Sequence, residues 1–220
     1  MIAEKLDQFS KQIPREVTLV AVSKTNPQEL LMEAYASGQR IFGENKVQEL
    51  VDKHEKLPKD IQWHFIGHLQ RNKVKYLAPF VDLIHRVESL RLLKEVNKQG
   101  IKNNRIINVL LQFHIANEDS KFGLSIEECI QLLKSEEYLV MQNVKIQGVM
   151  GMATFTKDPE QVRSEFKSLK TIYDELKSSS LSSEDGFSII SMGMSGDYEI
   201  AIEEGSNMIR IGSTIFGARN

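Results

Sequence analysis

The sequence is poor in cysteine, tryptophan and proline, with one Cys, one Trp and five Pro among 220 residues. A single cysteine, Cys129, excludes an intrachain disulfide and any metal site built from several thiolates. It also suits a reducing compartment, so we expect a cytoplasmic protein. No run of about eighteen apolar residues is present, and the first residues lack the apolar core of a signal peptide. We therefore expect no membrane partner.

An excess of charge of one sign is also missing, since 28 basic residues face 30 acidic ones for a net charge of −2. This balance argues against a nucleic-acid partner. The histidines show no HExxH-type spacing, so we expect no metal. No linker rich in Pro and Gly divides the chain, and the one low-complexity stretch is the polar run 178–186. We expect residues 1–220 to form one domain.

Apolar runs alternate with amphipathic segments along the whole chain. The runs that predict strands are 17–24, 40–44, 61–67, 81–87, 105–115, 144–152, 187–194 and 208–216. Eight strands alternating with helices favour a (β/α)8 TIM-type barrel over a doubly wound open sheet, which more usually has five or six strands. No sequence remains for a helix after the last strand, and an extra N-terminal helix at 2–12 could cover that place.

The residues at the strand ends are the candidate site, because barrels carry their active sites at that face. They are Lys24, Glu44–Asn45, His68, Arg86, His114, Met152, Ser195 and Arg210 to Ser213. Lys24 ends a strand that reads as buried, and desolvation favours the neutral amine that attacks a carbonyl. The position alone also suits a lysine whose ammonium simply reaches water.

The ends of the last two strands carry small residues. Ser195 follows Gly193, and Gly212 and Ser213 follow the final strand. Backbone amides approach an anion closely at such positions, although the glycines are equally compatible with tight turns alone. Arg210 lies inside an apolar run, so its guanidinium needs buried hydrogen-bonding partners or a core carboxylate.

Six blocks together resemble the pyridoxal-phosphate homeostasis proteins, also called proline synthase co-transcribed homologues, and the N-terminal barrel of alanine racemase. They are VAVSKT around Lys24, GENKVQE (43–49), WHFIGHLQRNK (63–73), SKFGL (120–124), SMGMSGDYEIAI (191–202) and IRIGSTIFGAR (209–219). The blocks span nearly the whole chain in order. Each is weak alone, and the ordered set is specific.

The resemblance implies pyridoxal 5′-phosphate held as an aldimine on Lys24. It implies that Ser195, Gly212 and Ser213 receive the phosphate, that Met192 lies near it, and that Arg210 faces the pyridine nitrogen. Asn45 would line the cofactor pocket. Lys46, His114 and Met152 depart from the family pattern, where an aromatic residue, an Asn and the racemase's ring-stacking His are expected. These departures leave the polar contacts of the pocket open.

The resemblance further implies a carrier rather than an enzyme. Racemases add a Tyr base from a separate C-terminal domain, which this sequence lacks, so we expect a non-catalytic protein that holds pyridoxal phosphate and affects amino-acid pools indirectly. Apo-enzymes that use the cofactor are the candidate recipients, and we expect a monomer. Two alternatives are a weak racemase and a barrel that binds a phosphate ligand without covalent chemistry.

Overall fold

A computed structural model of the chain describes residues 2–117 and 122–217. Its eight parallel strands close into a barrel, in which each strand pairs with the next along the chain and the last pairs with the first. The strands are β1 (Thr18–Val22), β2 (Ile41–Glu44), β3 (Gln62–Phe65), β4 (Leu83–Val87), β5 (Ile107–Gln112), β6 (Val144–Met150), β7 (Ile189–Ser191) and β8 (Met208–Ile211). The predicted barrel is confirmed.

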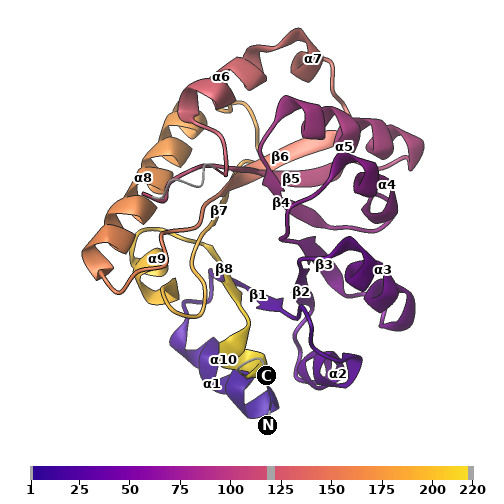
Figure 1. The fold of residues 1–220 in the computed structure, drawn as a ribbon, viewed down its shortest axis with the longest axis vertical. Helices are drawn as coiled ribbons and strands as arrows, with labels where there is room; N and C mark the ends of the chain where they lie inside the picture. Colours follow the sequence, from indigo (N-terminus) through magenta and orange to yellow (C-terminus); the bar gives the residue numbers. More distant parts are fainter. Residues whose placement is uncertain (1, 118–121, 218–220) are drawn as a thin grey trace.

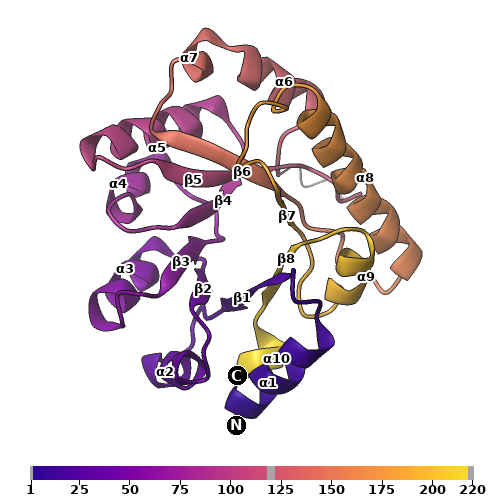
Figure 2. The same ribbon diagram turned by 180° about the vertical axis from the view of Figure 1, so that it is seen from behind.

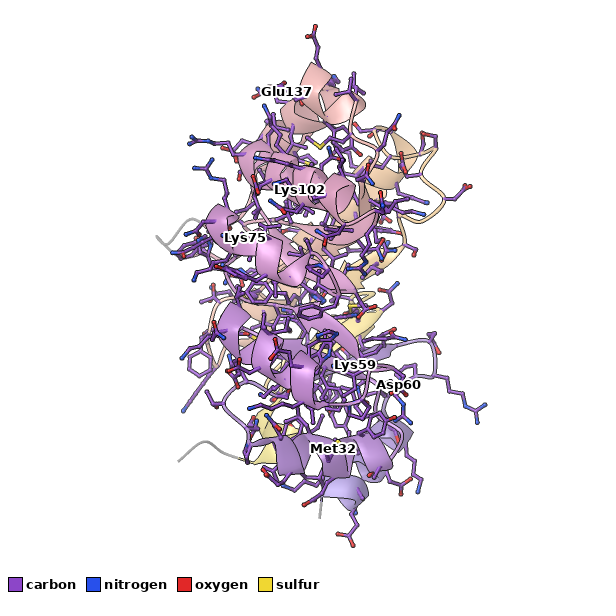
Figure 3. All side chains as sticks on the ribbon, turned by 90° about the vertical axis from the view of Figure 1, so that its right-hand side faces the viewer. Met32, Lys59, Asp60, Lys75, Lys102 and Glu137 are labelled. Atoms are coloured by element: carbon purple, nitrogen blue, oxygen red, sulfur yellow. The ribbon has the colours of Figure 1, made fainter. Side chains whose placement is uncertain are left out.

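Helices surround the strands, as Figures 1 and 2 show from opposite sides. They are α1 (Ile2–Gln12), α2 (Gln28–Ala36), α3 (Val47–Lys56), the 3-10 turn η1 (Arg71–Lys73), α4 (Val74–Leu77), α5 (Leu90–Lys102), α6 (Ile126–Lys134), α7 (Glu136–Leu139), α8 (Pro159–Ser178), α9 (Tyr198–Glu203) and α10 (Ser213–Phe216). Charged side chains such as Lys75, Lys102 and Glu137 project from the outer surface (Figure 3). The alternation of apolar and polar positions therefore matches the inner and outer faces of the helices.

Local sequence signals fix where several of these helices begin. The Leu92 N–H donates to the Ser89 Oγ at the start of α5. Ser125 and Glu128 form a reciprocal capping box at the start of α6. Such contacts satisfy amides that have no partner inside the helix, and each typically stabilises a helix by about 1 kcal/mol.

The first and last described helices, α1 and α10, lie side by side near the seam between β8 and β1 (Figure 1). Helix α1 buries Ile2, Leu6 and Phe9 and packs against α2 and α10. The expectation that no helix follows the last strand needs correction, because α10 forms a single turn there. The N–H groups of Ile215 and Phe216 both donate to the Gly212 carbonyl. A turn this short leaves room for α1 to cover the seam.

The inside of the barrel is apolar at one end and polar at the other. Val20, Leu83, Leu110, Met150 and Met208 form an apolar cluster of their own. Strand side chains alternate with a period of two. Residues two positions further along β4 and β8 therefore face the same interior and are His85 and Arg210, both buried. The polar layer lies toward the C-terminal strand ends.

Candidate functional site

A cavity of about 680 Å³ opens where the strands end. Its lining comes from the ends of β1, β2, β3, β4, β6, β7 and β8, and Val22, Ile66 and Met150 supply part of its apolar wall. Barrels of this kind carry their active sites at this face. The volume falls within the range of small-molecule sites.

Six of the seven residues singled out from the sequence line this cavity. They are Lys24, Asn45, Ser195, Arg210, Gly212 and Ser213. Met192 does not, because its side chain is fully buried in the main hydrophobic core. Its neighbour Ser191 faces the barrel interior, so the next side chain points outward toward the helices. The Met192 side chain therefore does not reach the cavity, and its predicted place near the phosphate, like the roles of the other six, stays a prediction.

The turns after β7 and β8 meet at one end of the cavity. The Gly212 N–H donates to the Ser195 Oγ at 3.4 Å. Within residues 2–117 and 122–217, the amides of Ser213 and Thr214 donate to no acceptor. A Cβ added to Gly196 would meet nothing within 4 Å, so the space beside it is open. Free amides, a hydroxyl group and open space fit a bound phosphate group.

Arg210 brings a fixed positive charge from β8 to the floor of the cavity. Its side chain is buried, donating from Nη1 to the Ser191 Oγ at 2.7 Å and from Nη2 to the Gly151 carbonyl at 3.2 Å. Burial lowers the pKa of Arg210 to about 10, and nearby Asp197 opposes that shift. The guanidinium therefore stays protonated at neutral pH.

A chain of hydrogen bonds continues from Arg210 across the barrel. The Ser191 Oγ lies 3.2 Å from the His85 Nδ1, and the His85 Nε2 lies 3.0 Å from the His64 Nδ1. Burial lowers the pKa of His64 to about 3 and the pKa of His85 well below its usual range. Both imidazoles are thus neutral at pH 7. A consistent direction is Ser191 donating to His85 and His85 donating to His64.

The sequence alone leaves these partners unassigned. An arginine inside an apolar run needs polar partners, and Arg210 finds a hydroxyl and a carbonyl rather than a core carboxylate. The alternation in QWHF (62–65) and LIHRV (83–87) could have placed His64 and His85 on the inner face. Neither pattern says which residue across the barrel they meet.

The backbone on both sides of Lys24 is tied to α3. The Lys53 Nζ donates to the Ser23 carbonyl at 2.9 Å, and the Thr25 N–H donates to the Glu49 Oε1 at 2.6 Å. Thr25 adopts a φ of 64°, a left-handed conformation that a β-branched residue rarely takes. These contacts hold the strand end in the turn that presents Lys24 to the cavity.

Lys53 is the centre of a buried ionic cluster behind that turn. Its Nζ lies 2.7 Å from the Glu44 Oε1 and 2.7 Å from the Glu49 Oε1. The Ser23 hydroxyl also donates to the Glu44 Oε1 at 2.6 Å. Burial raises the pKa of Glu44, and the charge of Lys53 counteracts the shift. The pair is therefore an internal support and is distinct from the amine that lines the cavity.

The remaining strand-end candidates divide into two groups. Arg86 and Met152 line the cavity, whereas His68 and His114 are not part of its lining. The exposed His68 ring places Nδ1 3.3 Å from the Glu88 Oε1. Ser120 and Lys121 of the SKFGL block, and Ala218 and Arg219 of the last block, lie outside the described residues.

Within 2–117 and 122–217, no three His, Cys, Asp or Glu side chains are grouped so as to hold a metal ion. In the same part of the chain, none of the helices combines the length and the apolar character that crossing a bilayer requires.

Comparison with known families gives a match over the whole chain. Residues 1–220 match the family model described as alanine racemase, N-terminal domain. The chain is 41% identical over 204 residues to a pyridoxal phosphate homeostasis protein of Aquifex aeolicus, covering 91% of this chain and 86% of the relative. A protein of the same name from Schizosaccharomyces pombe is 38% identical over 208 residues, covering 93% and 85%.

Solved structures show the same fold. PipY of Synechococcus elongatus PCC7942, solved with pyridoxal phosphate (PLP) bound, is 33% identical with a TM-score of 0.88. The match covers 99% of this chain and 100% of PipY. Alanine racemase of Clostridium difficile 630 has a TM-score of 0.78 at 13% identity, covering 99% of this chain and 60% of the racemase. That second likeness concerns the fold alone.

Proposed function

The chain belongs to the pyridoxal phosphate homeostasis proteins, which share the alanine racemase N-terminal domain, and we propose that it holds pyridoxal 5′-phosphate as an aldimine on Lys24. The observation that carries the proposal is the meeting of three groups in one cavity. These are an amine from the end of β1, a buried guanidinium from β8, and open amides and a hydroxyl at the ends of β7 and β8. An aldehyde, a ring nitrogen and a phosphate would each find a partner there.

Each residue has a distinct part in this proposal. Ser195, Gly212 and Ser213 receive the phosphate, and Asn45 lines the pocket beside the ring. Asn45 has a buried Oδ1 without a hydrogen-bond partner among the described residues, and a ligand donor would satisfy it. PipY, solved with PLP bound, is 33% identical over nearly the whole chain, which supports the same cofactor here.

Arg210 favours a carrier over an enzyme. Pyridoxal phosphate withdraws electrons best when its ring nitrogen is protonated. A guanidinium that stays charged beside that nitrogen opposes protonation and weakens this chemistry. The protein then holds, buffers and delivers the cofactor, acting as a monomer in the cytoplasm and supplying apo-enzymes that need it. The relatives carry the name of homeostasis proteins, in keeping with this role.

The visible spectrum of the purified protein tests the covalent link. We expect an absorbance band that borohydride removes, and mass spectrometry should then place the adduct on Lys24. Lys24→Ala should abolish the band and leave the fold intact, because the side chain lies at the edge of the cavity. An adduct on Lys46 or Lys73 would refute the assignment. Binding without any band would favour a barrel that takes a phosphate ligand non-covalently.

A second test concerns the phosphate. Ser195→Ala and Gly212→Asp should both weaken cofactor retention in dialysis, the second more strongly, since a carboxylate would meet the phosphate at short range. A Cβ at position 212 would also lie 3.3 Å from the Val22 carbonyl oxygen. Pyridoxal without phosphate should bind poorly to the native protein. Equal retention of the two forms would exclude the phosphate site.

A further inference from the structure

Arg86 gives the cavity a second guanidinium on the wall opposite the phosphate end. It belongs to β4, and in the eight-stranded ring β4 lies four strands away from β8. The pairing of β4 with β5 shifts register between Ile84 and Val87. A bulge of this kind re-aims side chains. It accounts for His85 facing the barrel interior while the next residue, Arg86, still lines the cavity.

One nitrogen of Arg86, Nε, donates a hydrogen bond to another side chain of the described residues. Its Nε donates to the Gln112 Oε1 at 2.7 Å, and Gln112 is itself buried on β5. The Phe122 ring centroid lies 5.8 Å from the guanidinium carbon. Within residues 2–117 and 122–217, neither Nη donates to an acceptor. An arginine anchored through Nε presents its remaining donors as a planar fork, the geometry that binds a carboxylate with two hydrogen bonds.

The charges that line the cavity also favour the binding of a second anion. Lys24, Arg86, Lys157 and Arg210 line it, and Asp197 is the single carboxylate among the described lining residues. Arg86 and Arg210 repel each other, which contributes to the lowered pKa of Arg210. A phosphate monoester brings about two negative charges. Arg86 then keeps its charge on the β4 side, where Glu88, which does not line the cavity, is its acidic neighbour.

We propose that Arg86 forms a second subsite in this cavity that binds the carboxylate of a small α-amino acid. The inference rests on the proposed function, because it assigns the phosphate of the cofactor to the far end of the cavity. Binding here is non-covalent. It would let the cofactor state of the protein respond to amino-acid concentration.

The test uses the protein with its cofactor reduced onto Lys24 by borohydride, so that no amine exchange takes place. L-Alanine and L-alaninamide, which lacks the carboxylate, are titrated at constant ionic strength and followed by ligand-observed NMR. We expect L-alanine to bind and the amide to bind at least about tenfold more weakly, given the usual strength of hydrogen bonds between charged groups. Equal binding of the two, or no binding of L-alanine, would overturn the proposal.

Three variants distinguish a specific contact with Arg86 from the overall positive charge of the cavity. Arg86→Gln should weaken L-alanine binding about tenfold or more, and Arg86→Lys, which keeps the charge without the fork, should fall between. Lys157→Gln removes an exposed charge from the same cavity and should change binding less than about twofold. Equal effects of Arg86→Gln and Lys157→Gln, or no effect of either, would overturn the subsite.

Cofactor retention distinguishes this inference from the proposed function. Arg86→Gln should keep pyridoxal phosphate in dialysis as the native protein does, and a loss as large as that of Ser195→Ala would make Arg86 a cofactor contact and overturn the subsite. If borohydride leaves no adduct on Lys24, the proposed function fails instead. The same titration of the untreated native and Arg86→Gln proteins then decides whether Arg86 binds the carboxylate.

Discussion

Arg210 is held inside the barrel by neutral partners. Hydrogen bonds to the Ser191 hydroxyl and the Gly151 carbonyl stabilise this buried charge, and Asp197 nearby adds an opposite charge. The charge of the guanidinium is therefore not neutralised by a direct carboxylate contact. It remains available to oppose protonation of a ring nitrogen bound above it.

The exchange of the α-proton of an amino acid tests this role of Arg210. The native protein should exchange the α-proton of L-alanine far more slowly than an enzyme, and Arg210→Glu should raise the rate by offering the nitrogen a carboxylate. Deuterium uptake measured by proton NMR gives both rates. Arg210→Gln, which removes the charge without adding an acid, is the control. Exchange of the α-proton by the native protein at about one turnover per second or faster would favour the hypothesis of a racemase over that of a carrier.

Lys53 is a residue whose loss should destabilise the fold. Lys53→Met leaves Glu44 buried without its cation and the Ser23 carbonyl without its donor. We expect the free energy of unfolding in urea to fall by about 3–5 kcal/mol. Lys56→Met, on the exposed face of the same helix, should change it by less than about 0.5 kcal/mol. Similar effects of the two substitutions would contradict the buried cluster.

Strands β3, β4, β7 and β8 are linked through the chain from Arg210 to His64. Each strand contributes one inward polar side chain at the level just below the cavity. Hydrogen bonds that cross the barrel fix the rotamers of these side chains, in addition to the backbone ladder between neighbouring strands. The floor of the site is therefore set by four elements together.

The neutral histidines of this chain make stability depend on pH. Below about pH 6.5 the unfolded chain protonates its histidines, whereas folded His64 stays neutral down to about pH 3. The unfolded state binds more protons in this window. The free energy of unfolding should therefore fall by about 1.4 kcal/mol per pH unit for His64 as the pH drops.

Denaturant unfolding of the native protein and His64→Gln between pH 7 and 4 measures this slope. The native protein should lose stability relative to the variant by about that amount per unit below pH 6. If the curves of the native protein and His64→Gln run parallel, His64 is not kept neutral by the fold.

The longer elements could be predicted from the sequence, and the contacts between distant elements could not. The eight apolar runs and the caps at Ser89 and Ser125 are local signals, so the barrel followed from them. The single turns α7 and α10 carry no periodic pattern and were missed. Six cavity residues lie at predicted strand ends, but the partners of Arg210, on the neighbouring strand β7 and just after β6, depend on how side chains of different strands meet inside the barrel.

Across the whole molecule, one part of the barrel interior is apolar core and the other part carries the ligand cavity. The apolar cluster of Val20, Leu83, Leu110, Met150 and Met208 fills one part of the interior. The polar layer and the cavity occupy the other, where the strands end. Met150 belongs to both parts, because it also lines the cavity, whereas substitutions of the other four act on stability and substitutions of the polar lining act on ligand binding.

Helix α1 packs over the seam where β8 pairs with β1. Phe9 is 3% exposed and its ring centroid lies 5.0 Å from that of Tyr198 on α9, so α1 is packed into the core and not merely appended to it. Phe9→Ala should lower the free energy of unfolding by about 3–5 kcal/mol. Phe155→Ala makes the same chemical change at a fully exposed residue beside the cavity and should change it by less than about 0.5 kcal/mol. Thermal and denaturant unfolding of the two variants measure these changes in the free energy of unfolding. Equal stabilities would mean that the barrel closes without α1, and the single turn α10 would then have to cover the seam alone.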